Sequence, residues 1–152
     1  MMKNLRKIVA QLVALPLIVV LAGCASTVSI EAAPLANDPA CANVIVRLPD
    51  TTDSQAKRST DSQSTAAWGN PAVVTLRCGL PAIKASTLPC IKAGGIDWLI
   101  KKVDGKTYSF TSFGRTPATE VWVDSTKVSA ATVLDDLGGP VGYTPQSAKC
   151  LG

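Results

Sequence analysis

The clearest structural signal in the chain is the segment at residues 96–113, which reads IDWLIKKVDGKTYSFTSF. Its first eight residues alternate in part between apolar and polar side chains, which is typical of a β-strand. Asp104-Gly105 is a strong signal for a two-residue hairpin turn. The remaining residues then return as a second strand, with Tyr108 and Phe110 on one face. The segment therefore predicts an antiparallel hairpin.

Two more strands are predicted, one after this hairpin and one before it. Residues 119–123 form the first, in which two valines alternate with Glu120 and Trp122. Residues 72–78 are largely apolar and β-branched, so they read as a well-buried strand, which a Gly-Leu-Pro sequence ends. Together with the hairpin, these segments predict a mainly antiparallel sheet of about four strands.

A first helix is predicted before the strands. Asp38 suits its N-cap and Pro39 its first helical position, and Pro49 ends it. The run 44–46 is β-branched and would also fit a strand. The apolar face of the helix follows the i, i+3, i+4, i+7 spacing and comprises Cys41, Val44, Ile45 and Leu48.

A second helix is predicted after the strands. Asp124, Ser125 or Thr126 could cap it, and Gly138-Gly139-Pro140 is expected to end it. The fold class that follows is α+β, with both helices packed on one face of the sheet. The apolar face of the second helix would comprise Val128, Ala131, Leu134 and Leu137.

The segment from Asp50 to Thr65 contains Ala56 as its only apolar residue. Such a segment cannot bury enough apolar surface to order itself, so we expect a mobile surface loop. A loop of this length could act as a functional lid, or it could be a surface excursion without a role.

The N-terminal segment predicts export. Three basic residues precede an apolar run at residues 12–22, and the sequence Leu-Ala-Gly-Cys that ends at Cys24 resembles a bacterial lipobox. The run has 11 residues and contains Pro16, so it is short of the roughly 20 residues that span a bilayer. We therefore expect a signal peptide at 1–23, a diacylglycerol on Cys24 and a flexible spacer at 24–37. A single extracytoplasmic domain at 38–152 would then be anchored to the cell membrane.

Charge and cysteine content agree with an exported domain. Without residues 1–23, twelve basic and eleven acidic side chains remain, with no basic tract that would indicate nucleic-acid binding. The chain has no histidine and no CxxC pair, so we expect neither a metal site nor a redox-active dithiol. Two disulfides are expected, in any of three connectivities, among Cys41, Cys78, Cys90 and Cys150.

Five blocks of sequence resemble, in their order, an actinobacterial lipoprotein family of unknown function, domain of unknown function 3515. They read DPAC at 38–41, AAWGNPAVV at 66–74, LRCG at 76–79, GIDW at 95–98 and FGRTPATEV at 113–121. The resemblance extends from about Asp38 to Cys150 and implies a lipid-anchored protein of the cell envelope, without implying an activity. It also implies that Cys41 pairs with Cys78 and Cys90 with Cys150.

Paired carboxylates are the one enzymatic signal. Without histidine, Ser-His-Asp and Cys-His hydrolases are excluded. Asp97 and Glu120 could face each other as the carboxylates of a glycosidase do. However, Arg115 is expected close to both carboxylates. A nearby guanidinium lowers the pKa of a carboxyl group, whereas a general acid needs a raised pKa. A cell-wall glycan hydrolase is therefore the alternative, and a non-enzyme is preferred.

The preferred function is a non-catalytic module that binds an envelope protein or a cell-wall component, with no cofactor. Saccharide and peptide pockets combine aromatic rings with amide and guanidinium groups, and the candidate binding residues are Trp68, Asn70, Arg115 and Glu120. Trp68 is expected to be the exposed aromatic, whereas Trp98 and Trp122 are expected in the core. Arg115 could contact a ligand or clamp neighbouring backbone carbonyls. An assembly or stability factor without a small ligand would look the same in sequence.

Overall fold

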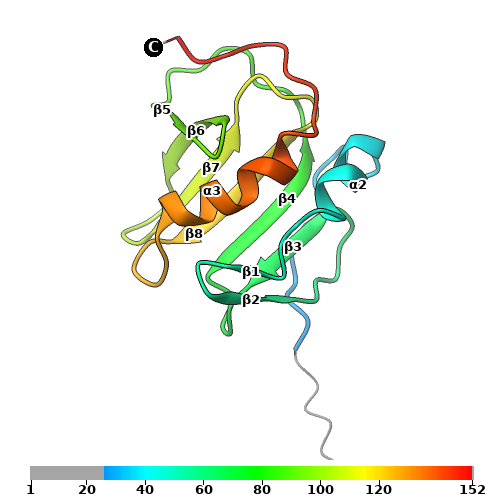
Figure 1. Cartoon of the computed structure of the whole chain (residues 1–152), viewed down its shortest axis with the longest axis vertical. Coiled ribbons are helices and arrows are strands. Elements are labelled where there is room, and N and C mark those ends of the chain that lie inside the picture. The colour runs from blue at the N-terminus through cyan, green and yellow to red at the C-terminus, as the bar shows by residue number, and fades with distance from the viewer. Residues whose placement is uncertain (1–25, 152) are drawn as a thin grey trace, which may run out of the picture.

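The computed structural model describes residues 26–151, which form one antiparallel sheet with two helices on one of its faces (Figure 1). The helices are α2 (Pro39–Ile45) and α3 (Ala130–Val141), and the strands are β1 (Thr51–Thr52), β2 (Gln55–Arg58), β3 (Thr65–Trp68), β4 (Val74–Leu80), β5 (Cys90–Ala93), β6 (Ile96–Lys102), β7 (Thr107–Ser112) and β8 (Ala118–Asp124). Their order in the sheet is β1-β2-β3-β4-β8-β7-β6-β5. The α+β class is confirmed, but the prediction of about four strands is wrong because the sheet has eight.

The predicted hairpin is present as β6 and β7, and β8 pairs with β7 to complete a meander. The Asp104 carboxylate accepts the backbone N–H groups of Lys106 and Thr107 at 2.8 and 2.7 Å, which fixes the turn. The strand expected at 72–78 is β4, which begins and ends two residues later and pairs with β8 in the middle of the sheet.

The core lies between the helices and the facing side of the sheet. Trp98 is fully buried there, as predicted. Trp68 is fully buried as well, and its indole N–H donates to the carbonyl of Pro49 at 3.1 Å. The expectation that Trp68 is exposed is therefore wrong, because the pairing of β3 with β4 places it opposite the buried Val74. Trp122 is 39% exposed instead, since it alternates with residues that point into the core.

Helix α2 begins as predicted, with the Asp38 carboxylate accepting the N–H of Ala40 at 2.8 Å. Helix α3 differs from the prediction at both ends. Its N-cap is Ser129, because the Asp124 side chain is used in a turn with Thr126 directly after β8. The helix also continues through Pro140 and buries one face against the sheet, comprising Val133, Leu134, Leu137, Gly138 and Val141.

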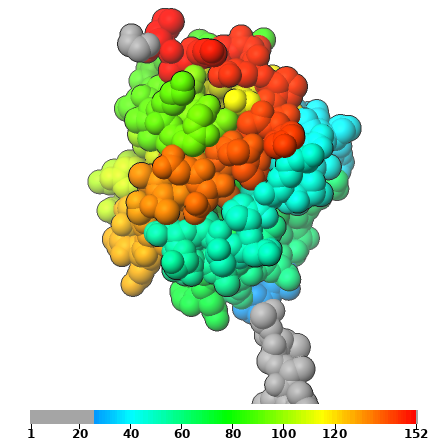
Figure 2. Space-filling view, in the orientation of Figure 1, coloured from blue at the N-terminus to red at the C-terminus, as the bar shows by residue number. Residues whose placement is uncertain are grey.

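Seen from the helical side, α3 lies across the sheet between β5 and the β1–β2 hairpin (Figure 2). This hairpin and the start of β3 occupy the segment 50–65, so the expectation of an unstructured loop is wrong. Polar contacts rather than apolar burial hold it. The Thr52 hydroxyl and the Asp53 N–H both donate to one carboxylate oxygen of Asp136 on α3, at 2.9 and 3.1 Å.

The chain before α2 also packs on the domain. We call residues 26–36 the N-terminal strap. Val28 pairs with Thr60, the N–H of Leu35 donates to the carbonyl of Gly79 at 2.8 Å, and Ala33 and Ala36 are buried. Most of the segment expected as a flexible spacer is therefore docked. The predicted signal peptide and Cys24 lie outside the described residues, and within the residues described no helix has the length and apolar character to cross a membrane.

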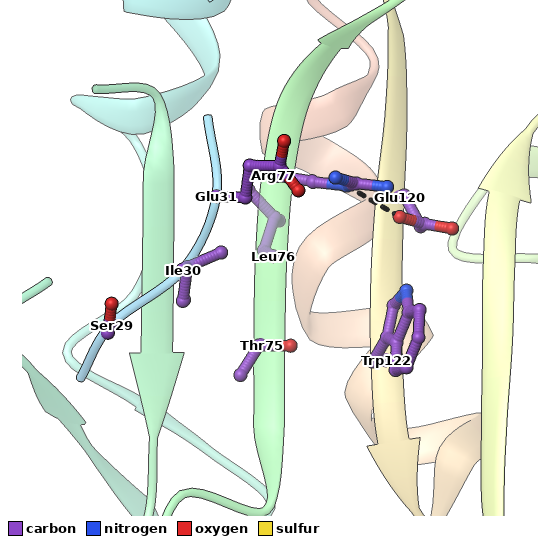
Figure 3. A pocket seen from close by; sticks show the side chains of 8 residues that line it. All are labelled: Ser29, Ile30, Glu31, Thr75, Leu76, Arg77, Glu120 and Trp122. Atoms are coloured by element: carbon purple, nitrogen blue, oxygen red, sulfur yellow. Dashed lines mark hydrogen bonds and ion pairs between the residues drawn. The ribbon is translucent and has the colours of Figure 1, made fainter. Parts of the chain in front are cut away.

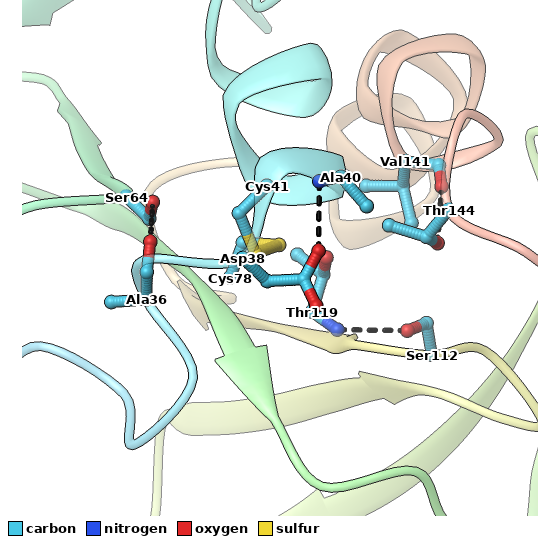
Figure 4. The surroundings of a disulfide bond; sticks show 10 residues. All are labelled: Ala36, Asp38, Ala40, Cys41, Ser64, Cys78, Ser112, Thr119, Val141 and Thr144. Carbon is cyan, nitrogen blue, oxygen red and sulfur yellow. Dashed lines mark hydrogen bonds between the residues drawn. A yellow bond between two sulfur atoms is a disulfide. The ribbon is translucent and has the colours of Figure 1, made fainter.

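Both disulfides pair as the family resemblance implied. Cys41 and Cys78 join α2 to β4 in the core, where neither is exposed (Figure 4). Cys90 and Cys150 attach the C-terminal tail to the start of β5, and both are half-buried. One bridge therefore belongs to the core and the other to the periphery of the domain.

Candidate functional site

The sheet face opposite the helices carries a pocket of about 400 Å³ between β4, β8 and the N-terminal strap (Figure 3). Side chains reach this face because those of Leu76 and Val121 point into the core, and alternation turns their neighbours outward. The strand register then places two cross-strand pairs side by side, Thr75 with Trp122 and Arg77 with Glu120. Residues 29–31 of the strap form the remaining wall. We call this the strap pocket.

An ion pair forms the polar part of the strap pocket. The Arg77 Nε lies 2.7 Å from the Glu120 Oε2, and the Glu120 Oε1 accepts the Ser109 hydroxyl at 2.9 Å. The Glu120 side chain is 11% exposed and that of Arg77 is 29% exposed. Among the described residues, Nε is the one guanidinium nitrogen of Arg77 with an acceptor. The outer N–H groups of the guanidinium are therefore free to donate to a ligand.

Trp122 supplies the apolar part of the site. Its ring also borders a second pocket of about 260 Å³, which Thr75 and Asp124 line as well. The indole therefore stands between two hollows on the surface of the sheet. Large aromatic side chains are usually well buried, so a tryptophan with 39% exposure beside an ion pair is a candidate contact for a ligand.

Hydrogen bonds to Asp61 and Arg58 hold the wall formed by the strap. The Ile30 N–H donates to the Asp61 carboxylate at 3.0 Å, and Arg58 Nη2 donates to the Ser26 hydroxyl at 2.9 Å. Hydrogen bonds from the Ser29 hydroxyl and from the Ile30 N–H lower the pKa of the exposed Asp61 carboxyl. The ionised carboxylate therefore favours the docked strap.

We expect Asp61→Ala to undock residues 28–31 at neutral pH, and acid to do the same to the native chain. The pKa of Asp61 in the folded chain lies below the ordinary 3.8. Its contribution is therefore complete above pH 3.8 and is lost as the pH falls through the lower value of the folded state. The measurement is hydrogen exchange at the Val28 and Ile30 amides, corrected for the intrinsic rate at each pH.

Asp104→Ala is the matched control, because Asp104 is another exposed turn aspartate whose pKa is lowered by backbone N–H groups. This variant should leave the exchange of the strap unchanged. Equal protection of the Ile30 amide in the native chain and in Asp61→Ala would contradict the claim that the Asp61 carboxylate holds the strap on the domain.

Of the four predicted binding residues, the strap pocket includes Glu120. Trp68 lies in the core, and Asn70 lies in an exposed turn, where its side-chain oxygen accepts Arg58 Nη1 at 3.1 Å. Arg115 is 7% exposed and donates to the carbonyls of Gly142 and Thr144 at 3.1 and 2.6 Å.

Of the two roles that the sequence allowed for Arg115, the structure shows the second, in which its guanidinium binds neighbouring backbone carbonyls. Burial lowers the pKa of the Arg115 guanidinium, and the charge of Asp97 partly offsets this effect. The ion-pair partner of Glu120 is Arg77 rather than Arg115.

Asp97 and Glu120 do not lie on adjacent strands. Asp97 is on β6 and Glu120 on β8, with β7 between them. The Asp97 carboxylate accepts the N–H of Cys150 at 3.1 Å, so it holds the C-terminal tail. Each carboxylate therefore has a structural partner. The described residues also contain no group of three potential metal-ligating side chains.

Sequence reasoning did not identify Arg77 or residues 29–31. Arg77 had a usable signal, because it stands between the apolar Leu76 and Cys78 in a strand and must point to the opposite face. No sequence signal indicated the strap, since it forms a wall of the pocket only by docking against residues about thirty positions later in the chain.

A family model described as protein of unknown function, DUF3515, matches residues 8–150 of the chain. No curated protein matches the chain. No solved structure matches it either.

Proposed function

We propose, for a chain that belongs to the DUF3515 family of proteins of unknown function, a role as a lipid-anchored, non-catalytic binding module of the cell envelope. The observation that carries this proposal is the exposed Trp122 beside the Arg77–Glu120 ion pair in the strap pocket. Binding sites combine an apolar or aromatic surface with a few fixed polar groups. Tryptophan and arginine are also the residues that most often dominate the energy of a binding interface.

The docked strap supports a site close to the membrane. One residue separates Ser26, which is held by Arg58, from Cys24. Ser29, in the wall of the pocket, is five residues from Cys24, a span of at most about 18 Å in extended chain. A lipid on Cys24 would therefore hold the strap pocket near the outer face of the cytoplasmic membrane, within reach of envelope proteins and of the innermost cell wall.

The alternative function, hydrolysis of cell-wall glycan, lacks comparable support. A glycosidase needs one carboxyl group that donates a proton and a second that acts as base or nucleophile. Glu120 is engaged by Arg77 and Ser109, and Asp97 by the backbone of the C-terminal tail. Because β7 separates the two strands, the carboxylates do not border one pocket. We therefore assign neither residue a catalytic role.

Crosslinking of the full lipoprotein in its own envelope tests the proposal. We expect Trp122→Ala and Arg77→Ala each to reduce capture of a partner or wall fragment by about tenfold, the effect of about 1.4 kcal/mol of binding energy. Trp122 is exposed, so Trp122→Ala should remain folded. Arg77→Ala leaves the Glu120 carboxylate without its ion-pair partner, so circular dichroism of each variant must show a folded domain before its capture is compared.

A second exposed aromatic–arginine pair provides the matched control. The Arg47 guanidinium lies 4.0 Å from the centre of the Tyr143 ring, which is 56% exposed. Tyr143→Ala and Arg47→Ala should capture the partner as the native chain does. Equal capture by all four variants would contradict a binding role for the strap pocket.

A further inference from the structure

We infer that the ligand of the strap pocket is a neutral saccharide chain, an inference that rests on the proposed function. The first argument is charge. Arg77 and Glu120 neutralise each other at 2.7 Å, and Glu31 is the other charged residue in the lining of the pocket. An anion would meet Glu31 and would compete with Glu120 for Arg77. Separating the ion pair would leave a largely buried carboxylate unpaired, which is costly. A neutral ligand leaves the pair intact.

The second argument is the pattern of hydrogen-bonding groups. The free N–H groups of Arg77 lie directly beside the carboxylate of Glu120, whose oxygens each retain a lone pair. The Thr75 hydroxyl lies on the same face, one cross-strand pair away. A sugar hydroxyl both donates and accepts, so neighbouring hydroxyls can bind such a donor and acceptor together. Hydrogen bonds to charged groups are also stronger than those between neutral groups.

The third argument is the position of Trp122. A pyranose ring presents a flat face of C–H groups, and the exposed indole offers a matching apolar surface. Because the ring stands between pockets of about 400 and 260 Å³, a chain of sugar rings can cross it with a unit in each hollow. The geometry therefore favours a linear oligosaccharide over a single enclosed molecule.

An extended peptide fits this position less well. Peptides that bind to sheets commonly add as a strand along an open edge. Arg77 and Glu120 belong to β4 and β8, which lie inside the sheet and have a strand on each side. Their backbone groups are therefore already used by neighbouring strands, and side-chain contacts alone would have to hold a peptide.

The three tryptophans allow a residue-specific test by NMR of the full chain in detergent micelles. Trp68 and Trp98 are fully buried, and their indole N–H groups donate to the carbonyls of Pro49 and Ala93. Trp122 is the exposed one. Neutral oligosaccharides released from purified cell wall and freed of peptide should shift the indole signal of Trp122 saturably, and leave the other two in place.

Variants then locate the contact. Because two of the variants lack the indole of Trp122, their binding is followed by the backbone amide signals of β4 and β8. Trp122→Ala should abolish saturable binding of the oligosaccharides, Trp122→Phe should retain part of it, and Arg77→Lys should weaken it. Tyr143→Ala should bind as the native chain does. Partial rescue by phenylalanine would distinguish stacking on an aromatic ring from a structural role of the indole.

Two further ligands separate the inference from the proposed function. If peptide stems or a lysine-rich peptide shift the Trp122 signal and the oligosaccharides do not, the saccharide assignment is overturned and a binding role for the pocket stands. If none of these ligands shifts the signal, and capture in the envelope is unaffected by Trp122→Ala, both the inference and the proposed function fail.

Discussion

Replacing Cys41 and Cys78 together by alanine is expected to lower the free energy of unfolding by about 4 kcal/mol. The bridge closes a loop with a sequence separation of 37 residues. In the chain-entropy model, a crosslink stabilises by restricting the unfolded chain, and the effect grows with the logarithm of loop length. Both cysteines are fully buried and link α2 to the central strand β4, so the folded state retains little freedom that the bridge could remove. Urea unfolding of the full chain, followed by circular dichroism, measures the loss.

The second disulfide is an internal control. Cys90 and Cys150 are separated by 60 residues, so loop entropy alone would predict at least as large an effect. However, Cys150 lies in the C-terminal tail, whose N–H bond to Asp97 is one of few contacts near its end. Without the bridge the tail can loosen in the folded state, which recovers part of the entropy. We therefore expect a clearly smaller loss for the Cys90→Ala, Cys150→Ala variant. Equal losses for the two bridges would contradict the distinction between a core and a peripheral disulfide.

The meander of β6, β7 and β8 was predictable because its signals are local. Alternation of side chains identifies each strand, and the Asp104 carboxylate sets the turn through hydrogen bonds to residues two and three positions later. Helix α2 was predictable for the same reason, since Asp38 caps it from the adjacent position. Elements stabilised by neighbours in sequence can be recognised without knowledge of the fold.

The β1–β2 hairpin was not predictable by this route. Its stabilising partner, Asp136, lies 84 residues after Thr52 and belongs to a helix. The composition of the segment predicts that it cannot order itself, because it contains almost no apolar residues. Composition gives no information about hydrogen bonds to residues far away in the sequence. The same limit applies to the strap, which contributes a wall of the pocket only after docking beside residues 58–61.

The candidate site shows which sequence signal should have had more weight. A general preference of tryptophan for the core placed Trp122 inside, and the neighbouring polar segment 50–65 favoured Trp68 as the exposed ring. Strand alternation favours the opposite assignment for Trp122, since Val121 and Val123 take the buried face. Arg77 follows from the same alternation in β4. The wall of the strap pocket formed by β4 and β8 could therefore be derived from strand alternation, whereas the wall formed by the strap required the tertiary structure.

A pair of adjacent glycines in α3 provides the last test, because their environments differ sharply. Gly138 packs directly on the β5–β6 turn, where an added Cβ would collide with the backbone of Gly94. That turn cannot retreat easily, since the N–H of Gly94 is held by the Asp135 carboxylate at 2.7 Å and its φ is +56°. Moving the helix away instead would uncover Leu134 and Leu137, which are fully buried. Overpacking of this kind costs about 1–3 kcal/mol, and we expect Gly138→Ala to lie at the upper end.

Gly139→Ala should have a much smaller effect. Apart from its chain neighbours and the adjacent backbone of α3, a Cβ at Gly139 meets no atom within 4 Å, and alanine is favoured over glycine inside a helix by about 1 kcal/mol. Pro140 follows directly, and a proline ring disfavours the helical backbone of a preceding residue that carries a Cβ, which offsets this gain. Urea unfolding of the two full-length variants should therefore show a free energy of unfolding lower by about 2–3 kcal/mol for Gly138→Ala than for Gly139→Ala. Similar stability of both would mean that α3 does not cross the β5–β6 turn at Gly138. This crossing positions the helix on the sheet. The same result would therefore also contradict the explanation for the burial of Trp98 on the helical face and the exposure of Trp122 on the opposite face.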